Sequence, residues 1–133
     1  MAQENVPVLL RVGLILAIII QGIYGLLLFI IPLQFAAWAQ GNPVDAGWLR
    51  WPGGILIALA VGAILTLRSP AKQGIYVLTL TIAVFLAGLA LLFSWITGEY
   101  SGQTWFIAQP AIVVLVEAVI LFFGWRSAKS ILT

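Results

Sequence analysis

The 133-residue sequence contains neither cysteine nor histidine, and both absences restrict the chemistry that it can support. Without cysteine there are no disulfides and no thiol redox centre. Without histidine there is no Ser-His-Asp triad, no imidazole base and no histidine ligand for zinc, copper or haem. We therefore expect a protein that is not an enzyme, with no catalytic residues and no metal site.

Charged residues are also scarce. They make up 8% of the chain, whereas 63% of the residues are hydrophobic, and an ordinary soluble domain is about 25% charged. A soluble fold of this size cannot bury so much apolar surface, so lipid must be the solvent. The net charge of +2 comes from six basic and four acidic residues without a basic run. It therefore does not indicate a nucleic-acid partner.

Four continuous apolar stretches are each long enough to cross a bilayer, which takes about 20 helical residues. They cover about residues 9–31, 51–67, 74–97 and 105–125. Strand spans do not fit, because barrel strands alternate between apolar and polar residues. The sequence predicts an all-α fold, a polytopic four-transmembrane-helix bundle that forms one domain over residues 1–133, with an outer interfacial loop over 32–50.

Two prolines lie near the outer ends of these spans. Pro52 is expected near the first turn of the second span, where its missing N–H does no harm. That span has the least defined start, which could lie as early as Gly47. Pro110 lies inside the first turns of the fourth span, where a lost backbone donor favours a local kink.

The basic residues sort to one end of the predicted bundle. Arg50 lies in the outer loop, and the other five basic residues flank the opposite ends of the spans: Arg11, Arg68, Lys72, Arg126 and Lys129. Cytoplasmic loops carry an excess of Lys and Arg. We therefore expect both termini in the cytoplasm, and the protein in a bacterial cytoplasmic membrane.

Tryptophan gathers on the predicted outer side. Trp38, Trp48 and Trp51 lie in or beside the outer loop. Indole prefers the headgroup level, so these side chains either anchor the protein or contact a lipid or another ligand. Residues 33–40 are expected to form a short helix in the interface.

Arg50 is the single basic residue of the outer loop and has three interpretations. Its side chain can extend to a lipid phosphate. It can instead pair with Asp45 or Glu99, or bind an anion together with the N-terminus of the second helix. The sequence leaves these interpretations open.

Small residues mark one face of the second span. Gly54, Ala58 and Gly62 recur every four residues, and the first span carries Gly22 and Gly25. Helices in lipid associate through close packing and hydrogen bonds. The Gly54 face is therefore expected to be a centre of close contact, with another helix of this chain or with a neighbouring subunit.

Glu117 is the most informative polar residue, because it lies close to the middle of the fourth span. An ionised carboxylate there costs about 2.5–3.5 kcal/mol, so we expect the protonated form at neutral pH. Gln21, at a similar depth in the first span, is the expected partner, with Tyr24 one turn further out. Three roles for Glu117 remain open. Its side chain either forms a structural hydrogen bond within the bundle or with a partner subunit, or is a proton- or cation-coupled site, or is a polar contact for a bound lipid, quinone or pigment.

A set of short motifs runs through residues 13–70. They are Gly22-x-x-Gly25 followed by Pro32, then Trp48-Leu49-Arg50, Gly53-Gly54, Gly62 and the ending Arg68-Ser69-Pro70. This set resembles the small four-helix membrane proteins grouped as DoxX-like. The resemblance implies a single four-helix bundle; some relatives are subunits of membrane oxidoreductases, and many have no assigned role. With no cysteine or histidine, a redox role would need a partner chain or a cofactor held non-covalently.

Together these features predict a small membrane protein without a catalytic site of its own. Its expected role is that of an accessory or assembly subunit, which packs against larger membrane proteins or against itself. One alternative is a binder of a hydrophobic ligand, such as a lipid, quinone or pigment, held non-covalently between helices. The other is a small proton-coupled transporter that uses Glu117 and needs oligomerisation to build a path.

Overall fold

The computed structural model describes residues 6–39, 45–99 and 104–133, and only the backbone of residues 104–107. These residues form helices in the order α1 (Val8–Ile30), α2 (Pro32–Trp38), α3 (Ala46–Arg68), α4 (Gly74–Ile96), α5 (Thr104–Ser127) and α6 (Lys129–Leu132). Within the described ranges four helices, α1, α3, α4 and α5, are long and apolar enough to cross a membrane. The expected all-α, four-span bundle is confirmed.

The second span differs most from its expected bounds. It begins at Ala46 rather than near residue 51, so Pro52 is the seventh residue of α3 and lies inside the helix. The sequence left open a start as early as Gly47, one residue from the observed Ala46, because backbone hydrogen bonds carry a helix beyond the hydrocarbon. Polar residues such as Arg50 are tolerated in the interfacial turns that result. Pro110 likewise lies inside α5.

Two short helices complete the chain. The helix expected over 33–40 is present as α2, with Pro32 in its first turn; residue 40 lies outside the described residues. Proline suits this place because its missing N–H would have no partner there. Helix α6 was not expected. It turns Leu132 into the bundle, where this side chain is buried. Leu132 packs closely against Gly74 of α4: a Cβ atom added at Gly74 would lie 3.0 Å from the Leu132 carbonyl oxygen.

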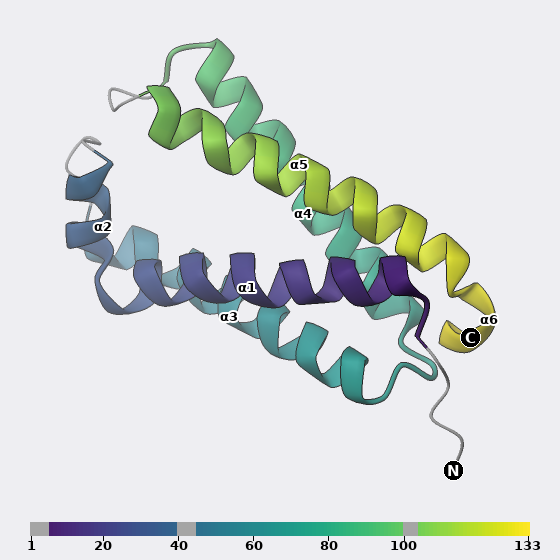
Figure 1. Cartoon of the computed structure of the whole chain (residues 1–133). Helices are drawn as coiled ribbons and strands as arrows, with labels where there is room; N and C mark the ends of the chain where they lie inside the picture. Colours follow the sequence, from purple (N-terminus) through teal and green to yellow (C-terminus); the bar gives the residue numbers. More distant parts are fainter. Residues whose placement is uncertain (1–5, 40–44, 100–103) are drawn as a thin grey trace.

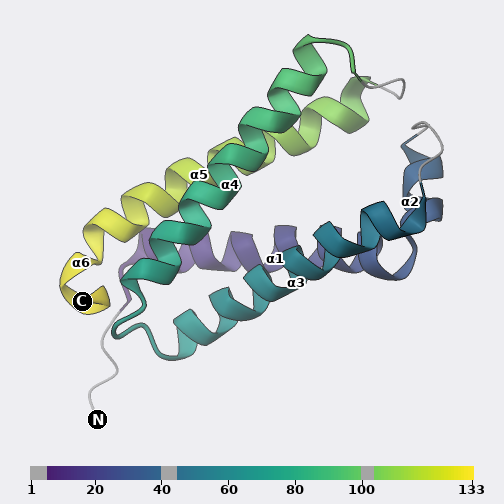
Figure 2. The same cartoon turned by 180° about the vertical axis from the view of Figure 1, so that it is seen from behind.

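The four long helices form two pairs that lie at an angle to each other. Helix α1 packs along α3, and α4 packs along α5. The pairs meet mainly through α1 and α5, whereas α3 and α4 have few contacts. Figures 1 and 2 show that the pairs converge where α1 begins and α5 ends, and diverge toward α2. We call these the closed end and the open end of the bundle.

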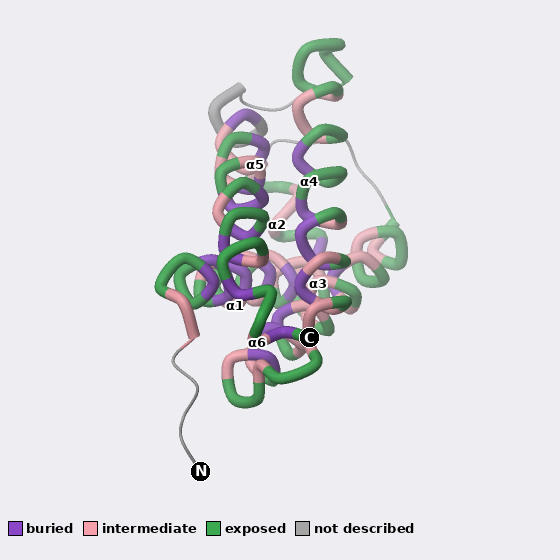
Figure 3. Tube along the Cα trace, turned by 90° about the vertical axis from the view of Figure 1, so that its right-hand side faces the viewer, coloured by how far each residue is buried: buried purple, intermediate pink, exposed green. Residues whose placement is uncertain are grey.

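The closed end contains most of the hydrophobic core. Leu10 and Leu14 of α1, Val77 and Leu80 of α4, and Leu121 of α5 are fully buried. In Figure 3 the buried stretches lie where the helices face one another. Glycines allow α1 and α5 to approach each other closely here, because any side chain at these positions would collide with the other helix. A Cβ atom added at Gly13 would lie 2.9 Å from Leu121 Cδ2, and one added at Gly124 would lie 2.7 Å from Leu10 Cα.

Helices α1 and α3 approach most closely at Gly25, which the sequence singled out, and at Gly53, which is not on the expected face of Gly54. A Cβ at Gly25 would lie 2.9 Å from the Ile57 nitrogen, and one at Gly53 would lie 2.8 Å from the Phe29 nitrogen. The close approach therefore uses Gly53 and not the face of Gly54. One residue turns the side-chain direction by about 100° on a helix of 3.6 residues per turn, so the two faces are distinct.

The expected small-residue face of α3 has three different environments. Gly54 lies in ordinary contact with the Phe29 ring, Ala58 is exposed, and Gly62 accommodates the ring of Tyr76 from α4. The Tyr76 hydroxyl donates a hydrogen bond to the Leu59 carbonyl oxygen. This face therefore makes one contact with α4 and is not the centre of packing within the chain.

The two adjacent glycines of α3 give a matched stability test. Gly53→Ala places a methyl group against the backbone of α1, so we expect it to lower the free energy of unfolding by about 1–3 kcal/mol. Gly54→Ala meets only ring carbons at 3.7 Å or more, and it should leave stability unchanged or slightly raised. Tryptophan fluorescence during denaturant titration in detergent measures both. Equal stability of the two variants would contradict the Gly53 crossing.

Candidate functional site

Glu117 and Gln21 form a buried hydrogen-bonded pair between α5 and α1. The Glu117 side chain is 0% exposed and that of Gln21 is 4% exposed. Gln21 Nε2 donates to both carboxyl oxygens, at 3.2 Å to Oε1 and 3.1 Å to Oε2. The pairing expected from their common depth is thus present. It joins the two helix pairs at the place where they begin to diverge.

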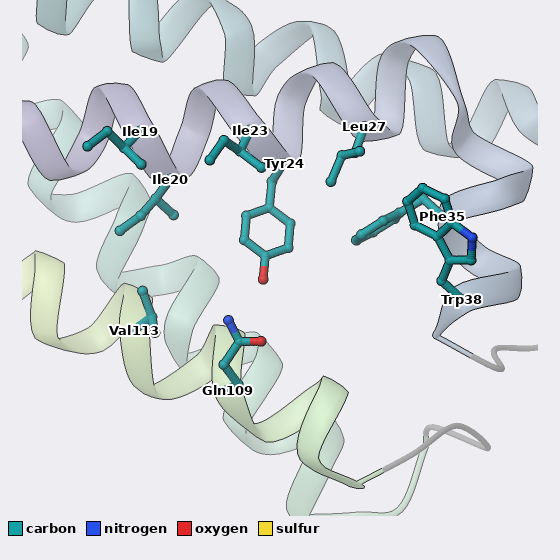
Figure 4. Close-up of a pocket in the computed structure, with 9 residues that line it drawn as sticks. All are labelled: Ile19, Ile20, Ile23, Tyr24, Leu27, Phe35, Trp38, Gln109 and Val113. Atoms are coloured by element: carbon teal, nitrogen blue, oxygen red, sulfur yellow. The ribbon is translucent and has the colours of Figure 1, made fainter.

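The other polar side chains near this depth of the bundle have different surroundings. Thr81 donates to the Val77 carbonyl oxygen of its own helix, and Thr79 is exposed. Tyr24 lies one turn beyond Gln21 and turns its hydroxyl toward Gln109 of α5 (Figure 4). In the described part of the chain, no buried side-chain nitrogen or oxygen lacks a hydrogen-bond partner.

A cleft of about 360 Å³ opens beyond this pair, on the side of the open end. Helix α1 lines one wall, α5 the opposite wall, and α2 the outer part (Figure 4). The lining residues are Ile19, Ile20, Ile23, Tyr24, Leu27, Phe35, Trp38, Gln109 and Val113. The volume falls within the roughly 300–1,000 Å³ of small-molecule sites, and an apolar lining with a few polar groups is typical of them.

Aromatic side chains stand at the outer part of the cleft. The rings of Tyr24 and Phe35 meet edge to face, with centroids 6.0 Å apart and planes at 85°. Trp38 is exposed at the end of α2. Edge-to-face contact is a favoured aromatic geometry and fixes the angle of Tyr24. The short helix α2 therefore positions the Phe35 ring against the Tyr24 ring, whose hydroxyl points into the cleft (Figure 4).

Two polar groups face each other across the cleft, from Tyr24 of α1 and Gln109 of α5 (Figure 4). Tyr24 was expected from the sequence to be a polar residue inside the membrane, whereas Gln109 was not. The available signal was a polar side chain inside the predicted fourth span; Gln109 lies eight residues before Glu117, which places the two about 80° apart around α5. Two polar contacts thus join α1 to α5: Tyr24 faces Gln109, and Gln21 bonds Glu117.

The cleft is closed toward the other end of the bundle. On α1 its lining reaches Ile19 and Ile20, next to Gln21, and on α5 it ends at Val113, before Glu117; the contacts of Gly13 and Gly124 lie further toward the closed end. Those glycine contacts leave no space for a Cβ atom between the helices. A molecule in the cleft is therefore accessible from the side and from the open end.

The outer residues singled out on α3 lie apart from this lining. Trp48, Arg50 and Trp51 are exposed on the first turns of α3. In the described part of the chain Arg50 forms no ion pair with Asp45 or Glu99, and Glu99 instead accepts a hydrogen bond from Ser94 at 2.7 Å. The described residues also bring together no group of three acidic side chains that could hold a metal ion.

Comparisons with known proteins found no relative of this chain. No protein-family model matches the chain, and no curated protein or solved structure matches it. The resemblance to DoxX-like proteins therefore has no support from a family match. Four long apolar helices and their packing define the chain as a small four-span membrane protein.

A double-mutant cycle tests the pair that joins α1 to α5. In Gln21→Leu or Glu117→Leu, one buried polar group loses its partner, so each change should lower the free energy of unfolding by about 1–3 kcal/mol. The double Leu variant removes both polar groups and should lose less than the sum, with a coupling of about 0.6–1.7 kcal/mol. Glu117→Gln keeps a hydrogen bond to Gln21 and serves as the control. Strictly additive losses in detergent unfolding would show that the side chains do not interact.

Proposed function

We propose that this protein binds a hydrophobic ligand between its helices, in the cleft formed by α1, α2 and α5. The cleft itself carries the proposal: it is about 360 Å³ in volume and mainly apolar, and Tyr24 and Gln109 face each other across it. A chain without cysteine or histidine suits a binding role better than catalysis. The ligand, a lipid, quinone or pigment, is held without a covalent bond.

The open end is proposed to face away from the cytoplasm. Arg11, Arg68, Lys72, Arg126 and Lys129 are all exposed at or near the closed end. Arg50 stands alone at the open end among the basic residues. The positive-inside rule then places the closed end in the cytoplasm and the cleft in the outer half of a bacterial cytoplasmic membrane.

A role as accessory or assembly subunit is the second proposal. Helix α4 turns Ala87 and Ala90 outward, with Ala83 half-buried on the same stripe. Small side chains let another helix approach closely in lipid, so this stripe offers a surface for a larger membrane protein or a second copy. The fold-level resemblance to DoxX-like proteins, some of them subunits of larger complexes, agrees with this role.

The proton-coupled alternative receives less support from the contacts of Glu117. Its carboxyl group is bonded to Gln21. Toward the closed end, the described residues between α1 and α5 are fully buried leucines and tightly packed glycines. A proton route would need polar groups or water where these contacts leave no space.

Filling the cleft tests the binding proposal. Ile20 lines the cleft, so Ile20→Trp should displace a bound molecule, whereas Leu86→Trp on the exposed face of α4 should not. We expect native mass spectrometry of the detergent-purified protein to show one retained hydrophobic molecule in the wild type and in Leu86→Trp, and loss in Ile20→Trp.

Two results would count against these proposals. A wild type that carries no bound molecule, or equal retention by Ile20→Trp, would remove the binding proposal. The same spectra also report on assembly, since an accessory subunit travels with a stoichiometric protein partner. Recovery as a bare monomer would contradict that role.

A further inference from the structure

We infer that the cleft selects an uncharged amphiphile that has one hydrocarbon portion and a hydroxyl or carbonyl head group. This inference rests on the proposed binding function and specifies the chemical class of the ligand. Four features of the cleft support this choice of ligand: the absence of charge among its described lining residues, its two hydrogen-bonding side chains, the depth of these side chains in the membrane, and the volume of the cleft. A second cavity elsewhere in the bundle provides an internal comparison.

The cleft lining contains no charged side chain among the described residues. An ionised head group held there would lose its hydration without gaining a counter-ion, which is costly in hydrocarbon. Glu117 does not supply a charge partner, because it is fully buried and bonded to Gln21. The ligand group that enters the cleft is therefore neutral.

The facing side chains can both donate and accept hydrogen bonds. The Tyr24 hydroxyl has one O–H and acceptor lone pairs, and the Gln109 carboxamide has an NH₂ group and a carbonyl oxygen. They point toward one another from opposite walls (Figure 4). A ligand hydroxyl or carbonyl placed between them can form hydrogen bonds with both side chains. A pure hydrocarbon can bond neither, so Tyr24 and Gln109 can then bond only each other.

The depth of this polar pair matches an amphiphile. Tyr24 lies six residues before the end of α1 at Ile30, which is about 9 Å at 1.5 Å per residue. Gln109 lies five residues after the start of α5, which is about 7.5 Å. The head group then lies just below the membrane interface, and its hydrocarbon portion contacts Ile20, Ile23 and Val113.

The size of the cleft limits how much of the hydrocarbon portion it encloses. A cavity of about 150 Å³ holds a benzene ring, so the 360 Å³ of this cleft is a little more than twice that space. This is room inside the cleft for one chain or a small ring system, and because the cleft is open at its side, the rest of the hydrocarbon portion extends among the lipid chains.

A second cavity of about 350 Å³ lies between α4 and α5 toward the closed end, lined in part by Leu78, Thr81, Phe85 and Val119. It has nearly the same volume as the cleft. Its one polar side chain, Thr81, already donates to the Val77 carbonyl oxygen. The two cavities therefore differ in the number of side-chain hydrogen-bonding groups in their lining and not in size.

The test uses three photoreactive ten-carbon probes in proteoliposomes that contain the full-length protein. They carry the same diazirine and end in a methyl, a hydroxyl or a sulfonate group. Mass spectrometry of the labelled protein locates the cross-links. We expect the hydroxyl probe to label Ile23 and Val113 about tenfold more than the methyl or sulfonate probe, the order expected for one or two hydrogen bonds. At Phe85 and Val119 the hydroxyl probe should have no advantage over the methyl probe.

The double variant Tyr24→Phe with Gln109→Leu should abolish the advantage of the hydroxyl probe while keeping the methyl probe in the cleft. Size-exclusion chromatography checks that the double variant is folded. If it is not, the labelling of the wild-type protein by the three probes still tests the inference. Equal labelling by the three wild-type probes, or a hydroxyl preference that persists in the folded variant, would overturn the inference and leave binding in place. Labelling of Ile23 and Val113 that does not exceed labelling of exposed Leu86 would contradict the binding function as well.

Discussion

The contact between α1 and α5 determines the shape of this protein. It is the main connection between the α1–α3 pair and the α4–α5 pair. On one side of the Gln21–Glu117 hydrogen bonds, Gly13 and Gly124 bring the two helices together; on the other side the helices diverge around a cleft. Along the α1–α5 contact, this buried polar pair therefore lies between closely packed helices on one side and the cleft on the other.

Lipid makes such a division possible. In water, a cleft lined by isoleucine and aromatic side chains would tend to close, because apolar burial is strongly favourable. In a bilayer the acyl chains are as apolar as the side chains, and helices associate only where packing and hydrogen bonds favour it. Close packing at the glycines and one polar pair can thus hold two helix pairs at an angle. The diverging surfaces remain available to lipid or to a more specific ligand.

The sequence predicted those features that depend on length and depth. Hydrocarbon thickness fixes how many apolar residues a span needs, so the four long helices could be recognised from composition alone. The partnership of Gln21 with Glu117 also followed, because both residues lie near the middle of their spans and a polar group in hydrocarbon requires a partner. The short helix α2 was also predicted, over residues 33–40.

Features that depend on helix rotation and crossing could not be predicted from the sequence alone. Both Gly53 and Gly54 are small, and only the three-dimensional crossing shows that Gly53 meets α1. The cleft arises from the angle between two helix pairs, which no local pattern encodes, so Gln109 had no evident partner until Tyr24 was placed opposite. The buried contact of α6 with Gly74 likewise depends on the chain turning back after α5.

The divergence of α1 and α5 can be measured directly by spin labelling in lipid bilayers, because a chain without cysteine accepts labels only at introduced sites. One pair of cysteines, Ile15→Cys with Phe123→Cys, reports the closed side of the Gln21–Glu117 pair; another, Leu26→Cys with Ile112→Cys, reports the open side, and all four positions are exposed. The account predicts a longer distance between α1 and α5 on the open side than on the closed side. Equal distances on both sides would show a parallel bundle without the cleft and would contradict it.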